Sequence, residues 1–219
     1  MGLLDYLVVA LLSLFAVASV VWYFRMRRKT LLLTKGLTDE LERTFRPVDK
    51  SYVLLGYLVG YRARYLLENG DKVYVLLTTL PRHSLIYYPI VRALGRRDRL
   101  EVAVEGSRRY VLRDLHAVLA RERRDEAVIR KDLGQRVELL SKRVVETPRG
   151  EYLVYYEDSG DLELVRRLLS AEGPIVYRLS TYKRFNLVSV AVEAREDSVP
   201  AAVKLLRELS RYVTASARS

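Results

Sequence analysis

The side chains best suited to chemistry are two histidines, and their setting gives no sign of catalysis. His83 precedes Ser84, but adjacent residues on a helix do not face each other, so they are not expected to act as base and nucleophile. The chain has no cysteine, so a zinc site would need His83, His116 and carboxylates gathered by the fold. We predict no catalytic residue, no metal site and no cofactor.

Acidic pairs and glycines lead to the same expectation. Glu157-Asp158 and Glu196-Asp197 precede predicted helices, where carboxylates interact favourably with the helix dipole. Neither a Gly-x-Gly-x-x-Gly nor a Gly-Lys-Ser/Thr spacing occurs, so no loop is expected to cradle a nucleotide phosphate. We therefore do not expect an enzyme. The alternative is an enzyme whose catalytic residues come together only in the fold.

Two clusters combine cations with aromatic rings, and they supply the candidate residues for binding a macromolecule. Both are predicted to lie at hairpin turns, where arginine forks could hold phosphates or carboxylates and rings could stack on a partner. The alternative is that these charges only keep the turns soluble and prevent strand pairing. The candidates are Arg108, Arg109, Tyr110, Tyr182, Lys183, Arg184 and Phe185.

The N-terminal residues predict a membrane anchor. Residues 3–24 are apolar apart from Asp5, Ser13 and Ser19, and as a helix residues 6–24 would rise about 28 Å, close to the hydrocarbon thickness of a bilayer. The charge bias across this segment predicts a single-pass anchor in the cell membrane, with the N-terminus outside and the rest cytoplasmic. The expected membrane-interface residues are Trp22, Tyr23, Arg25, Arg27, Arg28 and Lys29.

Two other interpretations of this segment remain open. Ala16-Val17-Ala18 is similar to the small-residue site of a cleaved secretory signal, although no cation precedes the apolar run and the run continues to Phe24. A buried helix of a globular domain is the second alternative, but such a helix rarely lacks a polar face over this length.

The composition is basic and poor in thermolabile residues. The net charge is +11, which suits membrane lipids with anionic headgroups or nucleic acid, or simply a mixed-charge surface beside a membrane. Asn, Gln, Met and Cys together number five, whereas Arg, Glu, Val, Leu and Tyr are abundant. This balance is typical of hyperthermophiles, so we expect a heat-loving and archaeal source.

The elements that must position these residues are predicted to form an α+β protein with a mainly antiparallel sheet. We expect a helix and basic extension at 1–35, a neck at 36–50, and two α+β halves at 51–134 and 135–219. Gly36 is predicted to end the first helix, with Thr38 capping a short second helix that ends near Phe45. Turns are predicted at 69–71, 106–107 and 148–150, and helices over 81–94, 117–132, 162–169 and 199–213.

The two halves suggest an internal repeat. Gly70-Asp71 lies 79 residues before Arg149-Gly150, and the segment GSRRYVL lies 75 residues before TYKRFNL. These offsets suggest two tandem ββαββα units, each too small to bury its sheet alone. The alternative is chance similarity between two ordinary α+β halves.

These observations favour a membrane-anchored adaptor or scaffold that recruits a macromolecular partner, most simply a protein, at the inner membrane face. The alternative is a membrane-tethered RNA- or ribosome-binding protein that uses the basic turns. Oligomeric state and the identity of the partner do not follow from the sequence.

Overall fold

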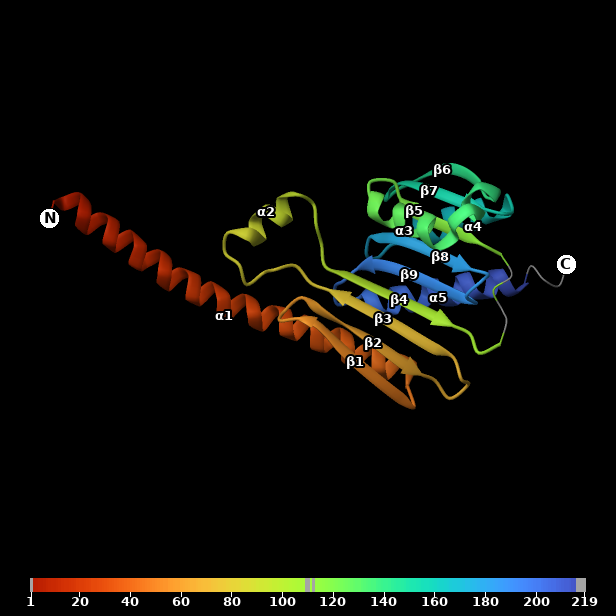
Figure 1. The fold of residues 1–219 in the computed structure, drawn as a ribbon, viewed down its shortest axis with the longest axis horizontal. Coiled ribbons are helices and arrows are strands. Elements are labelled where there is room, and N and C mark those ends of the chain that lie inside the picture. Colours follow the sequence, from red (N-terminus) through yellow and green to blue (C-terminus); the bar gives the residue numbers. More distant parts are fainter. Residues whose placement is uncertain (1, 109–110, 112, 216–219) are drawn as a thin grey trace.

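In the computed structural model, which describes residues 2–108, 111 and 113–215, the chain is an α+β protein built on one nine-stranded antiparallel sheet with a long N-terminal helix (Figure 1). The elements are α1 (Leu3–Phe45), β1 (Asp49–Gly56), β2 (Gly60–Leu66), β3 (Lys72–Thr78), α2 (Tyr87–Ala93), β4 (Arg99–Glu105), β5 (Leu115–Leu119), α3 (Arg123–Leu133), the 3-10 helix η1 (Gly134–Leu139), β6 (Ser141–Thr147), β7 (Gly150–Tyr156), α4 (Gly160–Ser170), β8 (Val176–Tyr182), β9 (Leu187–Glu193) and α5 (Ser198–Ala215).

Helix α1 runs without interruption through Gly36, so the predicted helix end there is wrong. Gly36 is exposed, and a glycine inside a helix costs only about 1 kcal/mol relative to alanine. Leu37 and Leu41, which follow it, are 2% and 0% exposed and belong to the main core, and their burial offsets that cost. Thr38 does not cap a new helix, because its hydroxyl donates back to the Thr34 carbonyl at 2.7 Å. The last turns of α1 are therefore core rather than neck.

The strand order is β1-β2-β3-β4-β9-β8-β5-β7-β6, and the two halves of the chain interleave in it. β4 pairs with β3 and β9, so the hairpin predicted at Gly106-Ser107 does not form. β5 instead lies between β7 and β8. All five residues of β5 are buried, which requires neighbours on both edges and cover on both faces. Neither predicted half completes its sheet alone, and the tandem repeat stays a hypothesis.

Local predictions succeed at several turns and fail at others. The predicted turns at Gly70 and Arg149-Gly150 connect β2–β3 and β6–β7, and the helices predicted over 162–169 and 199–213 are α4 and α5. Before the predicted turn at 69–71 the structure has two strands, β1 and β2, because the chain also turns just before Gly60. Gly60 has φ +133°, and a Cβ there would lie 1.9 Å from the Leu77 carbonyl oxygen, so only glycine fits.

Two predicted helices are shorter than expected. The helix predicted over 117–132 is divided between β5 and α3, and the helix predicted over 81–94 is reduced to α2. Pro89 does not kink α2, because it lies in the first turn, where its missing N–H has no partner to lose.

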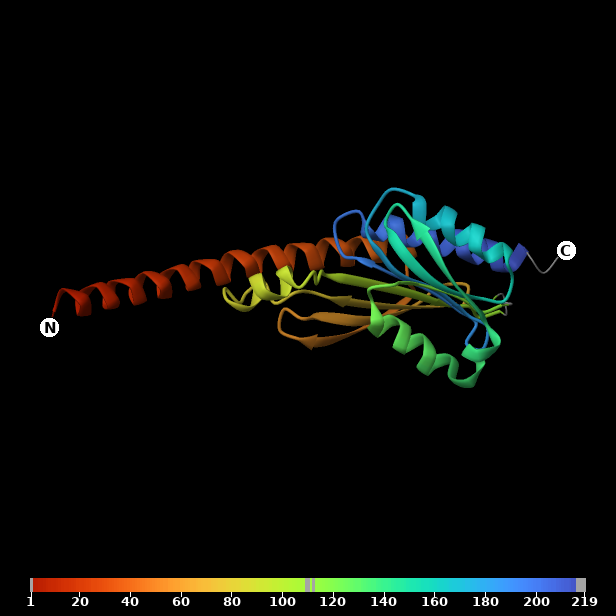
Figure 2. The ribbon, with the colours of Figure 1, turned by 90° about the horizontal axis from the view of Figure 1, so that it is seen from above.

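The helices cover the sheet unequally (Figure 2). The last turns of α1 lie with α4 and α5 on one face, over the main core, while α3 packs on the other face. Under α3 a smaller cluster of Val118, Ile129, Leu133 and Tyr182 is buried. β1–β4 carry exposed cations on the α3 side, including Arg62 and Arg64.

The first half of α1 projects away from the sheet as a free rod (Figure 1). Its most apolar 18-residue window is 0% buried. A helix of this length and composition fits a membrane span or a signal sequence. It does not fit the core helix of a globular domain, which would be buried.

Replacing Leu41 with alanine tests whether the end of α1 is core. Deleting a fully buried leucine leaves a cavity, so we expect the free energy of unfolding to fall by about 2–5 kcal/mol. The measurement is chemical denaturation of the detergent-solubilised chain. Asp39→Ala, exposed on the same turn, is the control and should change stability by less than about 0.5 kcal/mol. A Leu41→Ala variant as stable as the control would contradict this packing.

Candidate functional site

The predicted membrane-interface residues lie where α1 first touches the domain. Trp22 is half-buried, and its indole Nε1 donates to the Arg82 carbonyl at 2.9 Å. The Trp22 ring centroid lies 6.3 Å from that of Tyr88. The Tyr23 ring centroid lies 6.2 Å from that of His83, in an edge-on arrangement. The segment that follows β3 therefore packs directly against these two aromatic residues.

We call Arg25, Arg27, Arg28 and Lys29 the cationic collar, and these four residues differ in exposure. Arg25, Arg28 and Lys29 are exposed, as a cationic border with water requires. Arg27 is half-buried, with its guanidinium carbon 5.6 Å from the centroid of the Tyr57 ring in the β1–β2 turn. The collar thus both carries charge and contacts the domain.

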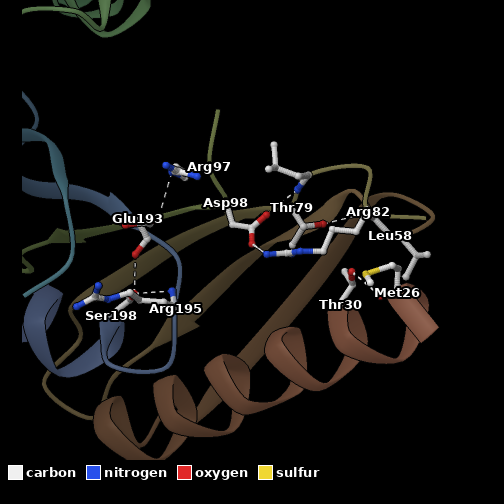
Figure 3. Close-up of polar contacts among 11 residues, drawn as sticks. Met26, Thr30, Leu58, Thr79, Arg82, Arg97, Asp98, Glu193, Arg195 and Ser198 are labelled. Carbon is white, nitrogen blue, oxygen red and sulfur yellow. Dashed lines mark hydrogen bonds and ion pairs between the residues drawn. The ribbon is translucent and has the colours of Figure 1, made fainter. Parts of the chain in front are cut away.

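An ion pair clamps the segment between β3 and β4 (Figure 3). Asp98 is 4% exposed and pairs with Arg82, and its Oδ1 accepts a hydrogen bond from the backbone N–H of Leu80 at 2.7 Å. The Thr79 hydroxyl donates to the Leu58 carbonyl at 2.7 Å, which joins the segment to the β1–β2 turn. Figure 3 shows this clamp above the α1 turn that contains Met26 and Thr30.

A cleft of about 480 Å³ opens beside the same segment, and arginines dominate its wall. Three of these arginines, Arg96, Arg97 and Arg99, are close together in the sequence, and the fold adds three more around the start of α3. Arg99 is neutralised by Asp125 and Glu101, whereas most of the others are exposed. The arginines are Arg96, Arg97, Arg99, Arg121, Arg123 and Arg124, with Glu122 the only acid in the lining.

Buried ion pairs hold α3 against the sheet at this cleft. The Arg99 guanidinium donates to both Asp125 carboxylate oxygens, with Nη1–Oδ2 at 2.8 Å, and Asp125 is 3% exposed. Arg178, 8% exposed, donates to Glu101 at 2.9 Å and lies 3.5 Å from Asp125. These contacts join β4, β8 and the first turn of α3. They fix the exposed arginines of that turn at the rim.

The predicted macromolecule-binding residues are only partly on the surface. Arg184 and Phe185 are exposed in the β8–β9 turn, and Arg108 is exposed nearby. Tyr182 is 5% exposed and packs on His116 with ring centroids 4.7 Å apart, so its ring is unavailable for stacking on a partner. Arg109 and Tyr110 lie outside the described residues.

Asn186 brings the two predicted clusters together. Its side-chain amide donates to the carbonyls of Gly106 and Arg108, at 2.8 and 2.6 Å, and its Oδ1 accepts from the Val111 N–H at 3.0 Å. The residue adopts φ +50°, which asparagine tolerates better than most residues. Arg108 therefore lies beside the β8–β9 turn. There a hollow of about 460 Å³ is lined by Arg136, Lys183, Arg184 and Asn186.

We call this second surface the distal tip, because it lies at the end of the sheet opposite the N-terminal rod (Figure 1). It comprises Arg108, Lys183, Arg184, Phe185 and Arg136. Arg136 is partly neutralised by Asp114, with Nη2 and Oδ2 2.7 Å apart. The distal tip is suited to an anionic partner.

Within the described residues, no three His, Cys, Asp or Glu side chains converge as metal ligands, at either histidine or elsewhere. His116 is 0% exposed, and no hydrogen-bond partner for its ring nitrogens lies in the described part of the chain. Burial, with a smaller effect of the Arg178 charge, lowers the pKa of the His116 imidazole to about 3. It is a neutral core residue at physiological pH.

No known protein family matches this chain, and no curated protein is similar to it in sequence. The functional proposal therefore rests on the site residues themselves.

The buried His116 predicts a loss of stability in weak acid. Below pH 6.5, the ordinary pKa of histidine, His116 is protonated in the unfolded chain but stays neutral in the folded chain. Acid therefore favours unfolding, and we expect the free energy of unfolding to fall by about 2 kcal/mol between pH 7.5 and 5. Denaturant titrations at several pH values measure this. His116→Leu should remove the loss, whereas His83→Leu, at a half-exposed position, should retain it. An unchanged pH dependence in His116→Leu would contradict the assignment.

Proposed function

We propose that the chain is a single-pass membrane protein whose cytoplasmic domain acts as an adaptor, recruiting an acidic partner protein to the inner membrane face. The observation that supports it most is the exposed apolar rod, which continues without a break into a helix packed in the domain core. A rod of this composition is stable in lipid and costly to leave in water.

The charges on either side of the anchor support its proposed orientation. Cations resist transfer across the bilayer, and they follow Trp22 and Tyr23 on the domain side. We therefore place the N-terminus outside and the sheet in the cytoplasm. The aromatic pair then lies at the headgroup level, where rings with a polar atom are favoured.

Two cationic surfaces of the domain support the adaptor role. The arginine-lined cleft and the distal tip both present guanidinium groups that can pair with carboxylates in forked geometry. The anchor confines these surfaces to a thin layer next to the membrane. This confinement raises their effective concentration toward membrane-bound partners without adding a contact.

Tagged protein in intact cells tests the anchor. We expect an N-terminal tag to be digested by external protease, a C-terminal tag to be protected, and the full-length chain to sediment with membranes. Leu12→Arg places a charge in the middle of the span. This raises the free energy of membrane insertion by about 3 kcal/mol, so the variant should insert less. Leu139→Arg, at an 82% exposed position in the domain, should not. Loss of the N-terminal tag from the mature chain would show a cleaved signal instead.

RNA is the second candidate partner, because Arg108, Lys183 and Arg184 lie together at the distal tip, at the end of the sheet opposite the proposed anchor. Single-stranded RNA can be held by such cations through its phosphates and by an exposed ring such as Phe185 through stacking.

Replacing Arg108, Lys183 and Arg184 together with alanine distinguishes the two partners. If RNA binds at the tip, the slope of log affinity against log salt should shrink by about 2 in filter or fluorescence binding. The control replaces Arg62, Arg64 and Arg143, three exposed cations elsewhere, and removes the same charge. Equal losses in both variants would indicate non-specific attraction. Capture of an acidic protein, without RNA binding, would favour the adaptor.

A further inference from the structure

We propose that α2 and its flanking residues form a second membrane contact, an interfacial foot that lies in the headgroup layer beside the span. The foot comprises Ile86, Tyr87, Ile90 and Leu94, and its occupant is the lipid surface. This inference rests on the proposed anchor and adds what the anchor alone lacks, a fixed orientation of the domain on the bilayer.

The foot is apolar on a face that no other described part of the chain covers. Ile86, Ile90 and Leu94 recur every fourth residue and are 67%, 51% and 71% exposed, and Tyr87 beside them is 51% exposed. Val91, one helical turn after Tyr87, is 3% exposed, so the exposed apolar face ends there. Four large exposed apolar side chains on so short an element are unusual for a surface bathed only in water.

The depth of the foot is set by its contacts with α1. The Trp22 indole donates to the Arg82 carbonyl at 2.9 Å, and the Trp22 and Tyr88 rings are neighbours. If Trp22 lies at the headgroup level, the segment bonded to it lies at that level too. Figure 1 shows α2 beside α1, on the N-terminal side of the sheet.

The foot cannot swing away from this position without breaking buried contacts. The foot lies within the segment between β3 and β4. The Arg82–Asp98 ion pair and the hydrogen bond from the Leu80 N–H to Asp98 join the two ends of that segment. The Arg96 N–H donates to the Val91 carbonyl at 3.1 Å, which closes the end of α2.

The charges around the foot suit an anionic lipid surface. Residues 79–97 contain four arginines and no aspartate or glutamate. Arg92, in the last turn of α2, and Arg96 are exposed next to the apolar face. Apolar residues at the acyl boundary with cations at the phosphates are the arrangement of an interfacial helix. An acidic partner could pair with the arginines but would leave the isoleucines in water.

Site-directed spin labelling tests the foot, and the cysteine-free chain needs no background substitution. Full-length Ile86→Cys and Ile90→Cys variants carry a nitroxide in liposomes of mixed neutral and anionic phospholipid. Collision rates with oxygen, which prefers lipid, and with a water-soluble nickel chelate report depth. Leu12→Cys marks the span, and Phe185→Cys, 47% exposed at the distal tip, marks water.

We expect the oxygen-to-nickel collision ratio at Ile86 and Ile90 to lie between the Leu12 and Phe185 values and clearly above the latter. A lipid-like ratio at Leu12 with water-like ratios at both foot positions would overturn the foot and leave the anchor intact. A water-like ratio at Leu12 would overturn both. Because all four positions are exposed, labelling is not expected to disturb folding.

Discussion

The whole arrangement depends on α1 being one helix whose two parts need different surroundings. Its first half exposes an apolar surface, while Leu37 and Leu41 are buried against the sheet. Burying each leucine contributes about 1.5–3 kcal/mol, which exceeds the cost of Gly36 between the two parts. A continuous helix has no hinge at this point. The direction of the proposed span therefore fixes the direction of the domain, and the contacts of Trp22 with the β3–β4 segment reinforce it.

The second constraint is electrostatic and lies under α3. Arg99 and Arg178 are largely removed from water, which is costly unless each guanidinium is paired, and Asp125 and Glu101 supply the pairs. Such a network need not add much to stability. It does fix the position of α3 on the sheet, because its partners come from β4, β8 and α3. It holds the first turn of α3 where its arginines repel those that follow α2. The cleft is thus a concentration of like charge that the fold maintains at a cost.

The sequence was sufficient for features that are encoded locally. The turns at Gly70 and Arg149-Gly150 and the helix α5 each depend on a few neighbouring residues. The sequence was insufficient where strand pairing or a surface depends on segments that are distant in the chain. β5 leaves β4 because β9 occupies that edge of β4, a non-local choice that no turn signal encodes. The residues of the distal tip form two separate clusters in the sequence, and the Asn186 side chain joins them through its bonds to the Gly106 and Arg108 carbonyls. The arginine-lined cleft likewise forms only where residues 78–80, 94–99 and 121–124 meet in the fold.

Together these constraints separate the two cationic surfaces in space. Leu94 and Arg96, at the end of the foot, also line the cleft, so a domain resting on the foot holds the cleft close to the headgroup layer. The distal tip lies at the opposite end of the sheet (Figure 1). A single span alone leaves rotation about its own axis free, and the proposed foot would remove that freedom. In that proposed orientation, anionic lipids would compensate the arginines nearest the membrane, and the distal tip would be the surface left for a cytoplasmic partner.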